Sequence, residues 1–428
     1  MAAQTAALVN RAAESPVLVF GSLPPTGRDL DLLARPRDEA AIAAALEREG
    51  YLRRGRSFAV FGGCTSFGVE LLPVSTLGLQ AAELDYLFEQ ARPIAGLTQL
   101  ARPAPHHALL LLARRVAWGG VLEPKLRRRV AEAVAERPSA WSEARAQASA
   151  WRAERALALL ESSYRGAPIS RRERGLSHRG LSPASAAHLL VRSTIRRRPR
   201  HPVVVAFSGL DGAGKSSQAG ALRDALLELD VDTAVVWSPL GGNLTLELIA
   251  RPLKRLLRSL RFGPFAGLAE RSGSGHVMSN PEGQSHGPGP RFVTQTWATL
   301  VMVLNLLSQR RAVMRHTLGG RRVVVFDRHV LDSVVRLRFL YGAAGSSRIQ
   351  LSLVNAIAPK ARFAYMLEIR PEIAFSRKPD DWTLDQLRRQ GELYKEHSER
   401  LSVPRLDGEL PREELCTEIA TEVWRALR

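Results

Sequence analysis

Cysteine, acidic residues and long apolar runs are the scarce features of this sequence. Only two cysteines occur in 428 residues, Cys64 and Cys416, and their spacing matches no metal-binding or redox motif. So few cysteines are typical of a reducing compartment, and we expect a cytoplasmic protein. The longest apolar stretches, such as residues 108–113, are too short to cross a bilayer. The first residues also lack the basic start and apolar core of a signal peptide.

Acidic residues are outnumbered by basic ones. The chain has 61 Lys and Arg against 42 Asp and Glu, which gives a formal net charge of +19. A basic surface attracts anions, and here it suits anionic substrates such as nucleotides. Contact with nucleic acid or with a membrane through this surface is an alternative that we do not favour.

Three regions differ in their residue patterns, as the length of the chain leads one to expect. Residues 1–120 alternate short strand and helix patterns, and residues 201–428 do so again. Between them, residues 121–200 have helical patterns to about residue 163. An arginine-rich stretch with Gly, Ser and Pro follows, and we interpret residues 121–200 as a helical and then mobile linker. Further expectations are strands at 16–22, 29–35, 57–63 and 66–74, a helix from Pro36, a short helix at 184–193, and a disordered insert at 271–290.

A glycine-rich loop between a strand and a helix is the strongest functional signal. Residues 203–207 form an apolar run typical of a buried parallel strand, and an amphipathic helical pattern follows the loop. The loop residues fit the pattern G-x-x-x-x-G-K-[ST]; they are Gly209, Leu210, Asp211, Gly212, Ala213, Gly214, Lys215 and Ser216, with Ser217 next. Glycines with positive φ let backbone N–H groups approach phosphates at a helix N-terminus. In such loops the lysine reaches the β- and γ-phosphates and the serine hydroxyl binds Mg²⁺, so we expect ATP and Mg²⁺ as cofactors.

A second strand pattern, at residues 323–326, ends in Asp327 and Arg328. Ligands of doubly wound sheets bind at the carboxyl ends of the strands, where Asp327 can bind Mg²⁺ directly or through water. Arg328 beside it can hold a phosphate through two parallel hydrogen bonds.

The ordered set of motifs resembles thymidylate kinases over about residues 202–428. The stretch F-S-G-L-D-G-A-G-K-S-S-Q is similar to that family's phosphate loop, and Asp327-Arg328-His329 is similar to its D-R-[YH] element. Residues 363–378 resemble its later strand and following helix. The resemblance implies an α/β, doubly wound parallel-sheet P-loop domain. It further implies that Asp211 contacts the sugar of the acceptor, that Arg328 holds the acceptor phosphate, and that Arg377 neutralises transition-state charge.

The acceptor side departs from the family pattern. Residues 237–242 read W-S-P-L-G-G where the family has R-E-P-G-G. No arginine stands near Asn305, where the family has one, although Arg310 and Arg311 follow about one turn later. We predict an ATP-dependent kinase that acts on a small anionic acceptor, most simply a nucleoside monophosphate such as dTMP. The alternatives are a kinase for a sugar or cell-envelope metabolite and a nucleotide-regulated binding module without catalysis, and a homodimer is also left open.

The N-terminal region has a constellation of its own. Gly21-Ser22 follow a hydrophobic strand, and Asp29 and Asp31 alternate along the next one, so both lie on one face. Glu70 is a third acid on a further strand, and three carboxylates on adjacent strands can hold two Mg²⁺ ions. This set resembles the polymerase-β-like nucleotidyltransferase superfamily over about residues 5–120, which implies a small α/β nucleotidyltransferase-like domain. A degenerate, non-catalytic domain or a scaffold with solvent-facing acids are the alternatives.

Overall fold

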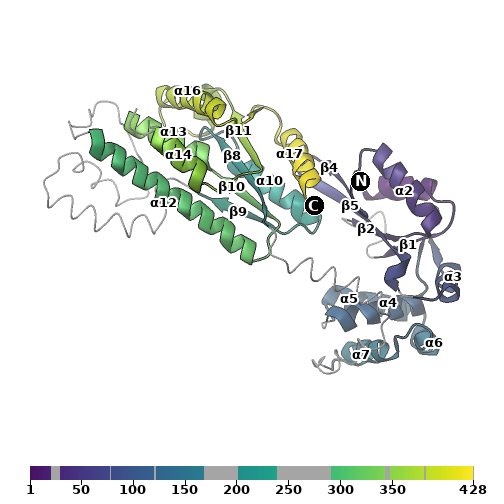
Figure 1. Ribbon diagram of the computed structural model, residues 1–428. Helices are drawn as coiled ribbons and strands as arrows, with labels where there is room; N and C mark the ends of the chain where they lie inside the picture. Colours follow the sequence, from purple (N-terminus) through teal and green to yellow (C-terminus); the bar gives the residue numbers. More distant parts are fainter. Residues whose placement is uncertain are drawn as a thin grey trace. The chain divides into compact units, whose positions relative to one another are not determined.

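The computed structural model describes most of the chain as two compact units (Figure 1). Unit 1 comprises Met1–Val60 and Phe67–Arg198, and unit 2 comprises Phe61–Ser66 and Pro199–Arg428. The described residues are 1–20, 29–77, 79–119, 122–167, 201–238, 291–342, 348–379 and 382–427. The predictions about Gly21-Ser22, the short helix at 184–193 and the insert at 271–290 therefore concern segments outside the described residues.

Unit 1 is built around a mixed sheet of seven strands in the order β3-β4-β5-β2-β1-β7-β6. Strand β1 pairs antiparallel with β2 and parallel with β7, while β2 pairs parallel with β5. The strands expected at 57–63 and 66–74 correspond to β4 and β5, which are neighbours in the sheet. The strands are β1 (Val17–Phe20), β2 (Asp29–Leu33), β3 (Leu52–Arg54), β4 (Ser57–Gly62), β5 (Thr65–Leu72), β6 (Arg92–Ile94) and β7 (Leu97–Arg102).

Helices pack on both faces of this sheet, because its central strands are apolar on both sides. Val17 and Val19 belong to one core with α1 and α2, whereas Leu18 between them belongs to a second core with α4 and the helices after it. The helices are α1 (Ala2–Ala12), α2 (Pro36–Arg48), the 3₁₀ turn η1 (Val74–Leu77), α3 (Ala81–Glu89), α4 (Pro105–Gly119), α5 (Pro124–Glu136), α6 (Ala140–Ala148) and α7 (Glu154–Tyr164).

The helices α5, α6 and α7 form part of unit 1 rather than a linker. Val130 of α5, Ala144 of α6 and Leu160 of α7 are buried in the same core as Leu109 of α4. The helical patterns expected up to about residue 163 are interrupted between α6 and α7, where Arg152 takes a φ of 50°. The apolar side chains of these helices thus pack against α4. Sequence spacing alone does not show this packing.

Unit 2 contains a parallel sheet of five strands in the order β12-β11-β8-β10-β9. The prediction of an α/β protein is confirmed at this level, with a mixed sheet in unit 1 and a parallel sheet in unit 2. The strands are β8 (Val203–Gly209), β9 (Thr233–Trp237), β10 (Val323–Asp327), β11 (Phe363–Glu368) and β12 (Arg405–Asp407). The helices are α10 (Lys215–Glu228), α12 (Arg291–Leu318), α13 (Val330–Tyr341), α14 (Arg348–Ile357), α15 (Pro371–Arg377), α16 (Leu384–Arg400) and α17 (Arg412–Ala426).

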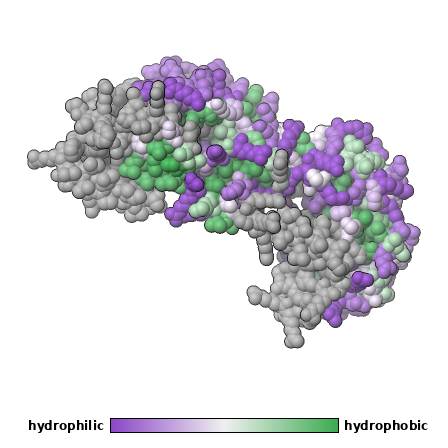
Figure 2. Space-filling view, viewed as in Figure 1, coloured by the Kyte–Doolittle hydropathy of each residue, from purple (hydrophilic) through white to green (hydrophobic). Residues whose placement is uncertain are grey.

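Strands β8 and β10 are the buried centre of unit 2. Val204 and Ala206 pack with Val324 and Phe326 in one cluster, against which Val313 of α12 lies. The exposed side of α12 still carries large apolar side chains, and Figure 2 shows apolar residues gathered around this part of unit 2. Because all five strands run the same way, the loops after β8, β9 and β10 emerge at one edge of the sheet, where the candidate site lies.

Candidate active site

The loop between β8 and α10 wraps around the side chain of Lys215. Gly209, Gly212 and Gly214 have positive φ values of 140°, 93° and 85°, which L residues rarely adopt. The buried Nζ of Lys215 donates hydrogen bonds to the carbonyl oxygens of Gly209 and Leu210, both at 2.8 Å. The three glycines of the motif thus have positive φ, and the loop carbonyl groups of Gly209 and Leu210 hold the Lys215 ammonium.

Two of these glycines are also required by close contacts. A Cβ atom at Gly209 would lie 2.5 Å from the carbonyl oxygen of Leu367 on β11, and one at Gly212 would lie 2.7 Å from that of Ala374 on α15. Ala213, between Gly212 and Gly214, is buried as well, although it carries a Cβ atom. The loop is thus held against β11 and α15 as well as by its own hydrogen bonds.

Ser216 and Asp327 lie together at the carboxyl edge of the sheet. The Ser216 hydroxyl donates to Asp327 Oδ2 at 2.5 Å, so β10 and the start of α10 meet where the sequence predicted. The other carboxylate oxygen of Asp327, Oδ1, is buried and has no hydrogen-bond partner among the described residues. Ser217, the next residue of the motif, is exposed.

This hydroxyl–carboxylate pair fits a Mg²⁺ site of the kind found with nucleotides. Mg²⁺ is held there by one or two protein oxygens together with phosphate oxygens and water, so a complete protein cage is not expected. The described residues contain no group of three or more His, Cys, Asp or Glu side chains arranged to hold a metal ion. The buried oxygen of Asp327 without a partner is the feature that a cation would satisfy.

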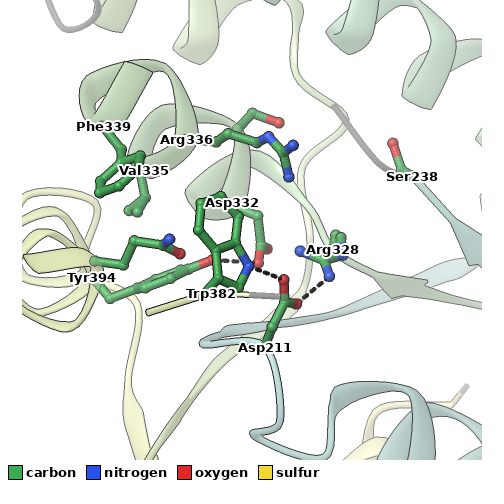
Figure 3. Close-up of a pocket in the computed structure, with 11 residues that line it drawn as sticks. Asp211, Ser238, Arg328, Asp332, Val335, Arg336, Phe339, Trp382 and Tyr394 are labelled. Carbon is green, nitrogen blue, oxygen red and sulfur yellow. Dashed lines mark hydrogen bonds and ion pairs between the residues drawn. The ribbon is translucent and has the colours of Figure 1, made fainter. Parts of the chain in front are cut away.

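A pocket lies next to the loop (Figure 3). Its walls come from the loop itself, from the end of β9, from α13 and from α16 with the segment before it. The lining residues are Asp211, Ser238, Arg328, Asp332, Ser333, Val335, Arg336, Phe339, Trp382, Gln390 and Tyr394. Polar, charged and aromatic side chains thus surround one space beside the loop.

Asp211 is the centre of the charge network in this pocket. Its carboxylate forms an ion pair with Arg328, lies 3.6 Å from Lys215 Nζ, and accepts a hydrogen bond from Trp382 Nε1 at 3.1 Å. Burial by itself would raise the pKa of Asp211, but the charges of Lys215 and Arg328 and the Trp382 hydrogen bond outweigh it and lower this pKa to about 2. Asp211 is therefore an ionised, fully engaged carboxylate at neutral pH.

Arg328 has a strained backbone at the end of β10. Its φ is 77°, in the left-handed region that side chains disfavour, and its backbone N–H donates to the Phe207 carbonyl at 3.1 Å. Burial alone would lower the pKa of its guanidinium, but the charges of Asp211 and Asp332 raise it. Strain of this kind persists where surrounding contacts fix the residue, and here it directs Arg328 toward the loop.

A second network orders the opposite wall of the pocket. Asp332 accepts hydrogen bonds from the Tyr394 hydroxyl at 2.8 Å and from the backbone N–H of His329 at 3.0 Å. Burial is the main cause that raises the pKa of Tyr394, with a further contribution from Asp332. For His329, whose charged form is the protonated one, burial lowers the pKa to about 4, so this histidine is neutral at physiological pH.

Trp382 covers one side of the pocket between aromatic and cationic neighbours. Its ring meets Phe339 edge to face, with centroids 5.7 Å apart, and the guanidinium of Arg336 lies 5.9 Å from the ring centroid. In Figure 3 the guanidinium of Arg336 extends into the space on the side of Arg328 and Ser238. An aromatic surface and two arginines are thus presented to the same space.

Arg377 lies outside this pocket at the loop itself. Its guanidinium donates to the Gly212 carbonyl at 3.1 Å, and its side chain is exposed. The structure therefore brings Arg377, Lys215, Ser216, Asp327, Arg328 and Asp211 to one end of the unit 2 sheet. Sequence reasoning missed Asp332, Arg336, Trp382 and Tyr394; none belongs to a recognisable motif, and only the tertiary fold brings them together.

The three acids of unit 1 are aligned but do not form a metal cluster. Asp31 on β2 is the register partner of Glu70 on β5, and Asp29 is the partner of Gly68, so the acids share one face. Among the described residues, neither these acids nor any other group of three or more His, Cys, Asp or Glu side chains is arranged to hold a metal ion. Arg129 of α5 is close enough for both aspartates to act on its pKa, although burial is the larger cause and lowers it.

Comparison of the chain with protein-family models gives no match, and no curated protein matches it either. Across the described ranges, no helix has both the length and the apolar character that crossing a membrane requires.

Proposed function

We propose that unit 2 is an ATP-dependent kinase that phosphorylates a small anionic acceptor, most simply a nucleoside monophosphate. The observation that carries the proposal is the loop after β8, which has three glycines with positive φ and whose Gly209 and Leu210 carbonyl groups accept hydrogen bonds from the buried ammonium of Lys215. A strand, a loop of this conformation and a helix N-terminus together make an anion-binding site for phosphates. Bound MgATP would supply the transferable phosphoryl group and the cation.

Each residue of the loop region has a role that its position supports. Lys215 and the backbone N–H groups of residues 212–216 would hold the phosphates of the nucleotide. Ser216 and Asp327 would orient Mg²⁺ through the hydroxyl and carboxylate oxygens that meet at 2.5 Å. Arg377, which reaches the loop at Gly212, would neutralise charge that develops during transfer.

The adjacent pocket supports an acceptor that is both anionic and planar. Arg328 and Arg336 supply positive charge, and Trp382 and Phe339 supply aromatic surface. Asp211 is a poor general base, because its pKa of about 2 lies far below the pH at which a base would work well. An acceptor oxygen that is already ionised, as in a phosphate, needs no such base.

The function of unit 1 is a separate proposal. Asp29, Asp31 and Glu70 share a sheet face as a nucleotidyltransferase site would require, and Arg129 close to the aspartates is compatible with a non-catalytic version. A cytoplasmic location and a homodimer likewise stay proposals.

Release of ADP in the presence of candidate acceptors tests the kinase directly. Nucleoside monophosphates and sugar phosphates would be screened with MgATP, each against the same mixture without protein. We expect acceptor-dependent ADP formation with at least one of them. Tight MgATP binding without turnover on any acceptor would instead favour a nucleotide-regulated binding module.

A further inference from the structure

The pocket contains an arginine that no sequence motif indicated. Among the described lining residues, the cationic ones are Arg328 and Arg336. Arg328 directly follows β10, whereas Arg336 lies about two turns into α13. Figure 3 shows the guanidinium of Arg336 on the side of the pocket where Arg328 and Ser238 lie. It is half-buried, and the ring of Trp382 lies on one side of it.

The helix α12, on which the resembled family carries an arginine near the position of Asn305, contributes neutral side chains instead. Asn305 of α12 is fully buried, and its Nδ2 donates to the Ser333 hydroxyl at 2.8 Å. One turn later Gln309, also buried, donates to the Ser238 hydroxyl at 3.2 Å. The next arginines on this helix, Arg310 and Arg311, are exposed and do not line the pocket. Positive charge on this side of the pocket thus comes from α13.

Burial and the neighbouring Arg328 both make the charge of Arg336 electrostatically costly. Burial is the main cause that lowers the pKa of the Arg336 guanidinium, and the nearby charge of Arg328 lowers it further. The charge of Asp211 opposes this effect. A ligand with two negative charges can interact with two guanidinium groups that line one space, and a phosphomonoester has that charge and the oxygen geometry for paired N–H donors.

We propose that Arg336 is the anchor for the anionic group of the acceptor, acting together with Arg328, and that this group is a phosphomonoester. The inference rests on the proposed kinase function and names the substrate class for its pocket. Ser238, whose hydroxyl oxygen accepts from Gln309, also lines this pocket and would donate its O–H to the same anion. The aromatic pair of Trp382 and Phe339 would then contact the rest of the acceptor.

Paired probes isolate the contribution of the phosphate. Titration calorimetry would compare dTMP with thymidine and ribose 5-phosphate with ribose, using the full chain. The variants are Arg336→Gln and Arg336→Lys, with Arg338→Gln as a control from the same helix outside the pocket. In the wild type we expect the phosphorylated member of at least one pair to bind more tightly.

The expected result is a selective loss. Arg336→Gln should weaken binding of the phosphorylated probe about ten- to hundredfold, which is the range for one charge-assisted hydrogen-bonded contact. Binding of the unphosphorylated partner and of MgATP should stay within about twofold, and retained MgATP binding also shows that the variant folds. Arg336→Lys should recover part of the loss, because lysine keeps the charge without the planar fork.

Two results would overturn the proposal. One is Arg336→Gln binding the phosphorylated probes as well as Arg338→Gln does. The other is a wild type that gains no affinity from the phosphate in either pair. These outcomes are separate from failure of the kinase proposal, which would appear as lack of MgATP binding or of ADP release in the wild type.

Discussion

Replacing Asp211 with Asn removes the charge at the centre of the unit 2 site. Its side chain is only 12% exposed and is held by Arg328, Lys215 and the N–H of Trp382. Asn keeps the shape but leaves the two cations without their carboxylate. We expect the variant to be less stable at neutral pH, because an unbalanced buried charge is costly.

The pKa of Asp211 sets the size of this effect. It falls from an ordinary 3.8 to about 2 in the folded chain. At 1.36 kcal/mol per pKa unit, ionised Asp211 contributes about 2 kcal/mol to the free energy of unfolding. Because the folded-state pKa is the lower one, this stabilisation is complete above about pH 4 and is lost as the pH falls toward 2, with roughly half remaining near pH 3.

Urea unfolding at pH 7, 5, 4 and 3 measures the difference in the free energy of unfolding between the wild type and Asp211→Asn. If the chain unfolds in more than one transition, the one that the substitution shifts is used. We expect a gap of at least about 2 kcal/mol at pH 7 and 5 that narrows by pH 3. Asp224→Asn is the control; its ion pair with Arg223 is 2.8 Å long but exposed, so the change should stay within about 0.5 kcal/mol. A gap that does not change between pH 5 and pH 3 would refute the assigned role of the Asp211 charge.

Two further substitutions test other parts of the structure: Gly209→Ala tests the loop of unit 2, and His107→Phe tests the core of unit 1. Gly209→Ala should lower the free energy of unfolding by more than about 2 kcal/mol in urea unfolding and weaken MgATP binding, because φ is 140° there and the new Cβ would lie 2.5 Å from the Leu367 carbonyl oxygen. Gly220→Ala in α10, where a Cβ meets nothing within 4 Å, should instead stabilise by about 0.5–1 kcal/mol, and equal losses in both variants would contradict this reasoning. Burial, aided by the charge of His106, lowers the pKa of His107 from 6.5 to about 4, so the unfolded chain takes up this proton first and stability should fall as the pH drops from 6.5 to 4. His107→Phe should make unfolding curves measured at pH 7, 6, 5 and 4 less dependent on pH, and an unchanged dependence would show that His107 is not responsible.

The sequence predicted those parts of the site that are local in the chain. The loop from Gly209 to Ser216 could be predicted because its conformation follows from glycine spacing between a strand and a helix. Asp327 could be placed beside Ser216 because parallel strands end at one edge of a sheet, and the 2.5 Å hydrogen bond between them follows from that topology.

The pocket could not be predicted in this way. Asp332 and Arg336 lie on α13, Trp382 precedes α16 and Tyr394 lies within α16, so only the packing of α13 on α16 brings their side chains together. The same holds in unit 1, where the charges of Asp29 and Asp31 act on the pKa of Arg129, which lies on α5, a helix whose sequence indicated only a linker.

Binding of MgATP to the full chain with and without Lys215 tests the central claim most directly. Calorimetry would compare the wild type with Lys215→Ala, and with Lys360→Ala as an exposed control in unit 2. We expect Lys215→Ala to weaken MgATP binding at least about tenfold and to abolish ADP release, because the buried ammonium at the centre of the loop is lost, while Lys360→Ala behaves as the wild type does. MgATP binding and turnover in Lys215→Ala equal to those of the wild type would contradict the assignment of this loop as the nucleotide site.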